Sequence, residues 1–390
     1  MQAKKHQLLF KISLLSISIF LMMAPQISPA IPLMYEAFPG ISPAGVETLV
    51  TIPNFGIMIG LFLSPFLIRF LGQKQTILLG LLVTLFSGTF PMYASDYTLI
   101  LISRFILGAG IGLFNSLAVS LIPQFYADDE DERATMLGYQ NVMGSLGAAL
   151  SSFLVGYLVT ISWHMAFAIY FLIIPSFILF FLFVPLKKEV AGTAVSHKQK
   201  QQLNSKVVVI AILMFFIFLF FMPSAFKLPV LIIEEGFGDA STPALVAGIS
   251  TLVGIPTGAA FGYLFKKLHD KILPLGFALV TLGFLGISLA PNLVILFLAV
   301  LLLGFGFGIA IPYMYNWLGW AAPEGSVNLA MTLVLILVNI GCFLSPTLLG
   351  SLSSLFGWTS ARGVMYLSTI GYVIIFLYSL GHYFRVHKKL

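Results

Sequence analysis

Three charged residues lie inside long apolar stretches of the sequence: Glu47, Arg104 and Lys227. An ionisable side chain within a membrane span is costly and by default suggests a functional site. A guanidinium binds planar anions through two hydrogen bonds, and Lys227 lies between Pro223 and Pro229, which can open a helix at a binding site. The two cations therefore predict a solute with negative or polar acceptor groups, and Glu47 is the candidate proton carrier.

Each cation also has a structural interpretation. Arg104 could bind backbone carbonyls or form an ion pair, with Glu47 as the best-placed acid, because a buried arginine without a partner would be expensive. Lys227 could instead extend its ammonium group to the outer membrane–water interface. The sequence leaves both pairs of alternatives open.

Neutral polar residues in the apolar stretches are further candidates for substrate binding: Gln26, Asn54, Asn115, Tyr313 and Asn339. The six histidines lie in loops or near the ends of expected helices, without metal-ligand spacing, and the single cysteine allows no disulfide framework. No nucleotide-binding motif or grouping of catalytic residues is present. We expect no metal, no cofactor and no enzymatic activity.

The composition sets the fold class. Of the 390 residues, 59% are hydrophobic and 9% are charged, whereas soluble domains carry roughly 25% charged residues. Because a membrane span needs about 20 apolar residues, the chain can hold about twelve spans. The net charge of +6 comes from basic residues in a few loops, which reflects membrane topology and predicts no nucleic-acid partner. The predicted fold is an all-α membrane protein of twelve transmembrane helices.

Apolar runs between polar clusters give the predicted positions of these helices. They are 8–33, 44–69, 75–94, 98–124, 134–159, 164–185, 207–233, 241–265, 272–290, 293–319, 327–355 and 361–384. With both termini in the cytoplasm, sixteen of the twenty Lys and Arg residues fall in cytoplasmic segments. Positive charge favours the cytoplasmic side, so this orientation is the expected one.

An internal repeat divides the chain. Leu107-Gly108-Ala109-Gly110-Ile111-Gly112 recurs as Leu303-Gly304-Phe305-Gly306-Phe307-Gly308, at an offset of 196 residues. Matches in two other helices have nearly the same offset, which indicates two related halves. We expect six-helix bundles at 1–186 and 207–390, related by pseudo-twofold symmetry and joined by a cytoplasmic linker at 187–206. The glycines could serve static packing or act as sliding surfaces between the halves.

Several motifs resemble those of the major facilitator superfamily. The pattern Arg-x-x-x-Gly-x-Gly begins at Arg104, and Gly72 and Lys74 match the family's loop between helices 2 and 3. Arg69 stands where that loop usually has an acid, and Glu132-Arg133 is similar to a common family pair. The resemblance implies a central cavity lined by helices 1, 4, 7 and 10. It also makes four residues candidates for cytoplasmic gating: Arg69, Gly72, Lys74 and Arg133.

The predicted function is secondary active transport of a small organic solute by alternating access, coupled to protons or to exchange. An anionic solute is one option within this prediction. The alternatives are a multidrug/proton antiporter and, from another class, a lipid-handling flippase or membrane-embedded enzyme. Ser151-Ser152 stands where drug antiporters of the family usually have Gly-Pro, and Gln26 stands where they often have an acid; both weaken the drug-efflux alternative. We expect a monomer in the plasma membrane, in contact with lipids.

Overall fold

The computed structural model describes residues 8–186, 202–323 and 326–387, and every regular element in these ranges is a helix. Ten helical segments are long and apolar enough to cross a membrane, and a bent pair at the N-terminus would make eleven. A shorter apolar helix, Thr242–Gly258, accounts for the remaining predicted window. The predicted count of twelve is consistent with these segments.

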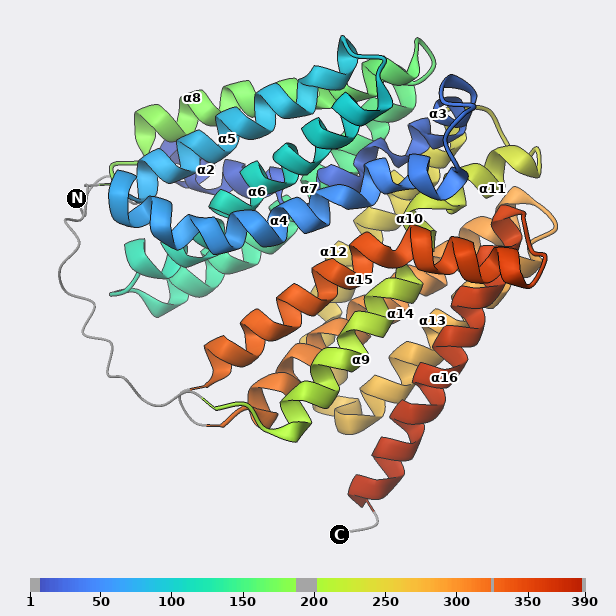
Figure 1. Ribbon diagram of the computed structural model, residues 1–390. Coiled ribbons are helices and arrows are strands. Elements are labelled where there is room, and N and C mark those ends of the chain that lie inside the picture. The colour runs from blue at the N-terminus through green and yellow to red at the C-terminus, as the bar shows by residue number, and fades with distance from the viewer. Residues whose placement is uncertain (1–7, 187–201, 324–325, 388–390) are drawn as a thin grey trace. The chain divides into compact units, whose positions relative to one another are not determined.

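The chain forms two compact units (Figure 1). One contains Met1–Ile41 and Thr48–Val195, and the other contains Ser42–Glu47 and Ser196–Leu390. The first turn of α4 therefore belongs to the second unit, although the rest of that helix belongs to the first. Most of the predicted linker, at 187–201, lies outside the described residues, so its limits stay a prediction.

The first unit begins with a segment that the sequence window 8–33 did not describe fully. α2 (Leu8–Ser16) and η1 (Ile17–Phe20) are followed by η2 (Ala24–Ala30) and α3 (Ile31–Ala37), with a bend of 52° between the two parts. Pro25 and Pro29 lie in the second part, and proline cannot donate the backbone hydrogen bond that a continuous helix requires. The first span is thus broken and ends later than predicted.

The remaining helices of the first unit follow the predicted windows closely. They are α4 (Pro43–Leu71), α5 (Gln73–Thr89) with η3 (Phe90–Met92), α6 (Tyr97–Phe125), α7 (Glu130–Leu158), and η4 (Trp163–Leu172) with α8 (Ile173–Phe183). α7 starts four residues before its predicted beginning, because Asp129 caps its N-terminus by accepting a hydrogen bond from the Glu132 amide. Three acidic residues, Glu130, Asp131 and Glu132, therefore form the first turn of α7.

The second unit opens with another broken span. α9 (Ser205–Phe221), α10 (Pro223–Phe226) and α11 (Leu228–Glu234) are separated at Met222 and Lys227. The helices that follow are α12 (Thr242–Leu268) with η5 (His269–Lys271), α13 (Ile272–Leu289), α14 (Leu293–Ala321), α15 (Val327–Leu355) and α16 (Ala361–His387). α13 packs against both α14 and α16 (Figure 1).

The repeated glycines make equivalent helix contacts in the two units. A Cβ atom at Gly80 on α5 would lie 2.7 Å from the Gly110 carbonyl oxygen on α6. A Cβ atom at Gly306 on α14 would lie 2.7 Å from the Gly276 carbonyl oxygen on α13. Both glycine pairs are related by the offset of 196 residues. In each unit, the absence of a side chain lets two backbones approach closely.

Candidate functional site

Arg104 is fully buried in the first unit, where all three guanidinium nitrogens donate hydrogen bonds. Nε donates to the Leu49 carbonyl (2.9 Å), Nη2 to the Ala24 carbonyl (2.5 Å) and Nη1 to the Tyr170 hydroxyl (2.6 Å). The rings of Tyr170 and Phe167 each lie 5.8 Å from the guanidinium carbon. Among the alternatives for Arg104, the geometry matches the carbonyl ligand.

The position of these partners explains why a cation is needed there. Ala24 begins η2, directly after the break in the first span, and its carbonyl accepts a hydrogen bond from the Arg104 guanidinium. Through its three hydrogen bonds, Arg104 on α6 joins the broken span to α4 and η4. Its fixed partners indicate that it holds the break in place.

Gln26 lies next to the same break. Its side-chain oxygen accepts a hydrogen bond of 2.5 Å from the Ser152 hydroxyl on α7, and its amide nitrogen donates to the Met22 carbonyl at 3.1 Å. The Ser151 hydroxyl is fully buried and makes no hydrogen bond to any of the residues that the structure describes. Ser152, part of the pair that departs from the drug-antiporter pattern, thus gives α7 a polar contact with the broken span.

Lys227 lies at the equivalent break of the second unit, between α10 and α11. Its ammonium group forms an ion pair with the carboxylate of Glu47, at the start of α4. The side chain of Lys227 is 9% exposed and that of Glu47 is 1% exposed, so neither charge is well hydrated. The expected acid for Arg104 is therefore the partner of Lys227.

This location differs from the simple alternative for Lys227, in which its ammonium reaches the outer interface. The Lys227 amide donates to the Pro223 carbonyl at 2.8 Å, and its own carbonyl accepts from the Leu231 amide at 2.9 Å. The backbone thus bridges the two short helices while the side chain points to Glu47. In secondary transporters, sites for substrates and coupling ions are typically formed where a membrane helix is interrupted, as it is here.

The other predicted substrate ligands are spread over both units. In the first unit Asn54 is half-buried and donates to the Thr51 carbonyl, and Asn115 on α6 is also half-buried. In the second unit Asn339 donates to the Leu335 carbonyl, and the buried Tyr313 hydroxyl donates to Asp270 at 2.6 Å. Tyr313 belongs to a pocket described below.

The predicted gating residues lie at one end of the first unit. Gly72 has a positive φ of 90°, which explains why a glycine joins α4 to α5 there. Lys74 donates to the Phe181 carbonyl at 2.7 Å, Arg69 is exposed, and Arg133 lies 3.5 Å from Glu130. An exposed pair of this kind contributes little to stability.

Sequence reasoning missed one ion pair at the same end. Lys11 on α2 pairs with Glu132 on α7, and both side chains are about a quarter exposed. Lys11 lies within the first predicted window, 8–33, where no partner was expected for it. Its spacing from Glu132 gives no signal, because the two residues meet through helix packing.

Sequence reasoning also missed a cluster of polar contacts in the second unit, where α11 and α13 end and α16 begins. Arg362 donates to the Glu235 carboxylate (2.5 Å) and to the carbonyls of Ser288 (2.8 Å) and Ala290 (2.7 Å). The hydrogen bond from Arg362 holds the pKa of Glu235 below its usual value. Arg362 lies in the first turn of α16, where the structure gives it three hydrogen-bond partners.

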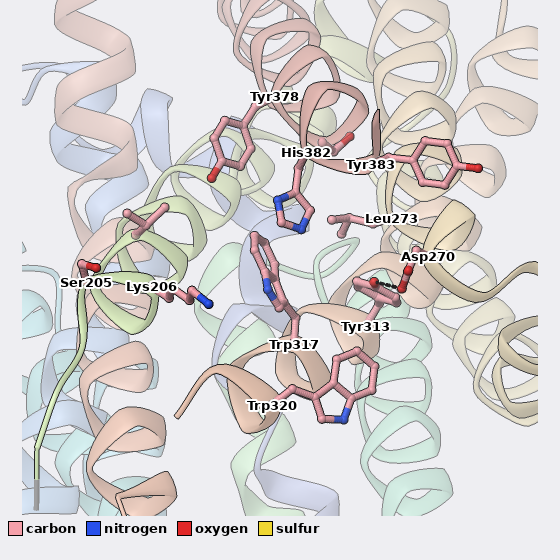
Figure 2. A pocket seen from close by; sticks show the side chains of 12 residues that line it. Ser205, Lys206, Asp270, Leu273, Tyr313, Trp317, Trp320, Tyr378, His382 and Tyr383 are labelled. Carbon is pink, nitrogen blue, oxygen red and sulfur yellow. Dashed lines mark hydrogen bonds between the residues drawn. The ribbon is translucent and has the colours of Figure 1, made fainter. Parts of the chain in front are cut away.

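A pocket of about 460 Å³ lies at one end of the second unit, where α9 and α13 begin and α14 and α16 end. Figure 2 shows Lys206 on one side of this pocket and Asp270 with Tyr313 on the other, with Trp317 and His382 between them. The Trp317 and His382 rings are 4.4 Å apart. This pocket was not anticipated, because its walls come from four separate segments.

Long apolar helices, two proline-broken spans and charges buried at both breaks define a helical membrane transport protein. The sequence matches the Major Facilitator Superfamily model over residues 12–319 and again over 210–389, so the chain belongs to this superfamily. The two overlapping matches are consistent with the internal repeat.

Similar proteins support the same class. A probable nitrate transporter, NarT, of Staphylococcus haemolyticus (strain JCSC1435) is 24% identical over 375 residues, covering 92% of each chain. The nucleoside transporter NupG has a TM-score of 0.82 at 10% identity, covering 96% of this chain and 99% of its own. The inward-open xylose transporter XylE from E. coli has a TM-score of 0.72 at 14% identity, covering 95% of each chain. The protein is thus a secondary transporter of a small solute.

Proposed function

We propose that this transporter carries a small anion, that Lys227 binds the anion and that Glu47 couples its movement to a proton. The observation that carries the proposal is the buried ion pair between these residues at the break of the seventh span. The similarity to a probable nitrate transporter over most of both chains supports an anionic substrate. The structural alternative, in which the Lys227 ammonium extends to the outer membrane–water interface, does not explain why an acid is buried against it.

The pair suggests how binding of a proton and binding of an anion are coupled. While Glu47 is ionised, its carboxylate neutralises Lys227 and competes with any anion for the ammonium group. Protonation of Glu47 removes that competitor and leaves a buried cation, which is unfavourable until an anion replaces the carboxylate. Anion binding and proton binding therefore favour each other, which is the requirement for symport.

Arg104 has a different role in this proposal. Because its guanidinium is already bound by two carbonyls and a hydroxyl, it keeps the first span broken rather than binding solute. Gln26 is the polar side chain at that break that we propose as a neutral ligand. Transport by alternating access, location in the plasma membrane, cytoplasmic termini and a monomeric state remain parts of the same proposal.

Uptake into vesicles that contain the purified protein tests the substrate class. The panel should contain nitrate, small organic carboxylates, a nucleoside and a lipophilic cation. We expect saturable uptake of at least one anion, and Lys227→Met should abolish it. Lys206→Met is the matched control, because it removes a lysine at the N-terminal end of α9, and it should retain uptake. Uptake of the lipophilic cation alone would support drug efflux and refute the proposal.

A further inference from the structure

The pocket at the end of the second unit has chemistry that the proposed anion site does not use. Its lining includes a cation on α9, a histidine on α16 and a carboxylate in η5, together with five Tyr and Trp side chains. About 21 residues separate Lys206 from Lys227 along one span, which at 1.5 Å per residue is roughly 30 Å. The pocket is therefore a separate site from the Lys227 break.

The position of the pocket indicates the environment of its ligand. It lies at the first turn of α9 and the last turns of α14 and α16, which are ends of three candidate membrane spans. Trp320 is 61% exposed and Tyr378 is 43% exposed, and exposed Trp and Tyr at the ends of spans are typical of the level of lipid headgroups. In a membrane, the amphiphilic molecules whose polar groups lie at that level are phospholipids.

The arrangement of charge narrows the class of headgroup. In Figure 2 the ammonium group of Lys206 and the carboxylate of Asp270 lie on opposite sides of the pocket, with the Trp317 ring between them. A headgroup that carries a phosphate and an ammonium matches both charges, because the phosphate faces Lys206 and the ammonium faces Asp270. The face of an indole ring also attracts an ammonium group.

Tyr313 contributes to the side of the pocket that carries Asp270. Its hydroxyl donates a hydrogen bond to one carboxylate oxygen of Asp270, and this bond orients the carboxylate. A purely anionic headgroup has no ammonium group, so it would leave the Asp270 carboxylate without a counter-ion in the pocket. We infer that this pocket binds the headgroup of a zwitterionic phospholipid, with the phosphate at Lys206 and the ammonium at Asp270.

Native mass spectrometry of the purified full chain can test this inference, with phosphatidylethanolamine, phosphatidylcholine and phosphatidylglycerol offered separately. We expect the two zwitterionic lipids to bind at least tenfold more tightly than phosphatidylglycerol. Asp270→Asn should remove this preference, and Lys206→Gln should weaken binding of all three lipids. Lys267→Gln removes a basic residue close by in sequence that does not line the pocket, and it should change nothing.

Three results would overturn the inference. One is equal binding of phosphatidylglycerol, and another is an unchanged lipid preference in Asp270→Asn. The third is binding of soluble glycerophosphoethanolamine as tightly as the lipid, which would make the ligand a free metabolite. Melting temperatures of the lipid-free variants establish folding, and Tyr313→Phe, which removes only the hydroxyl bonded to Asp270, gives a milder second test.

Discussion

The ion pair between Glu47 and Lys227 makes a specific prediction about stability. Glu47→Gln leaves the Lys227 ammonium buried without its acid, in surroundings where the lysine side chain is 9% exposed. Removing one partner of a buried pair costs about 3–5 kcal/mol. At about 2–4 °C per kcal/mol for a unit of this size, the melting temperature should fall by roughly 6–20 °C.

A transported anion should reverse this loss. In Glu47→Gln the anion becomes the counter-ion of Lys227, so it should raise the melting temperature of the variant by more than that of the wild type. The double variant Glu47→Gln/Lys227→Met has no buried charge at this position. It should recover most of the stability, since replacing a buried pair by neutral groups is often neutral or favourable, and it should not respond to the anion.

Thermal unfolding of the purified protein, followed by intrinsic fluorescence with and without the anion, measures these effects. The reasoning would be refuted if Glu47→Gln were as stable as the wild type, because the charges would then be hydrated. It would also be refuted if the anion stabilised the double variant as much as Glu47→Gln, because Lys227 would then not be the ligand.

Three further predictions test other parts of the structure. Gly108→Ala should destabilise the contact of α4 with α6 by about 1–3 kcal/mol, because the new Cβ atom would lie 2.1 Å from the Pro53 carbonyl oxygen. Thermal unfolding measures this loss, and Gly138→Ala is the control, because its new Cβ atom would meet no neighbouring helix within 4 Å among the described residues. Arg104→Lys should lower the free energy of unfolding by about 3 kcal/mol or more, since one ammonium cannot replace three hydrogen bonds. The KM for transport by the folded fraction should stay unchanged. A raised KM at unchanged stability would show that Arg104 binds substrate. The pKa values of Glu235 and Asp239 are lowered by hydrogen bonds from Arg362 and Ser241 respectively. Their stabilisation is therefore present above about pH 4 and lost as pH falls further. Hydrogen-exchange protection at residues 235–242, corrected for the pH dependence of the intrinsic exchange rate, should therefore fall in acid in the wild type and depend less on pH in Asp239→Asn.

The sequence predicted the helices well because membrane spans are defined by composition. The windows for α13 and α15 match the observed helices to within one residue at each end. The breaks were harder to place. Pro223 and Pro229 indicated one correctly, whereas the window 8–33 ran through Pro25 and Pro29 without a break. Proline alone does not place a break, because α4 continues through Pro53 and Pro65.

The candidate site shows the same limit. Charge inside an apolar stretch was enough to select Glu47, Arg104 and Lys227 as unusual residues. Their pairing was not predictable, because Glu47 is close to Arg104 in expected depth but pairs with a lysine 180 positions away in the chain. Depth can be read from the position along a helix, whereas the direction of a side chain depends on packing.

Proton movement during anion transport tests the central claim most directly. Vesicles containing the protein and a pH-sensitive dye receive an inward gradient of the transported anion, and anion uptake and internal pH are recorded together. The account predicts that the wild type acidifies the interior as the anion enters, and that Glu47→Gln still exchanges labelled for unlabelled anion without acidification. Equal acidification per anion by Glu47→Gln and the wild type would contradict it.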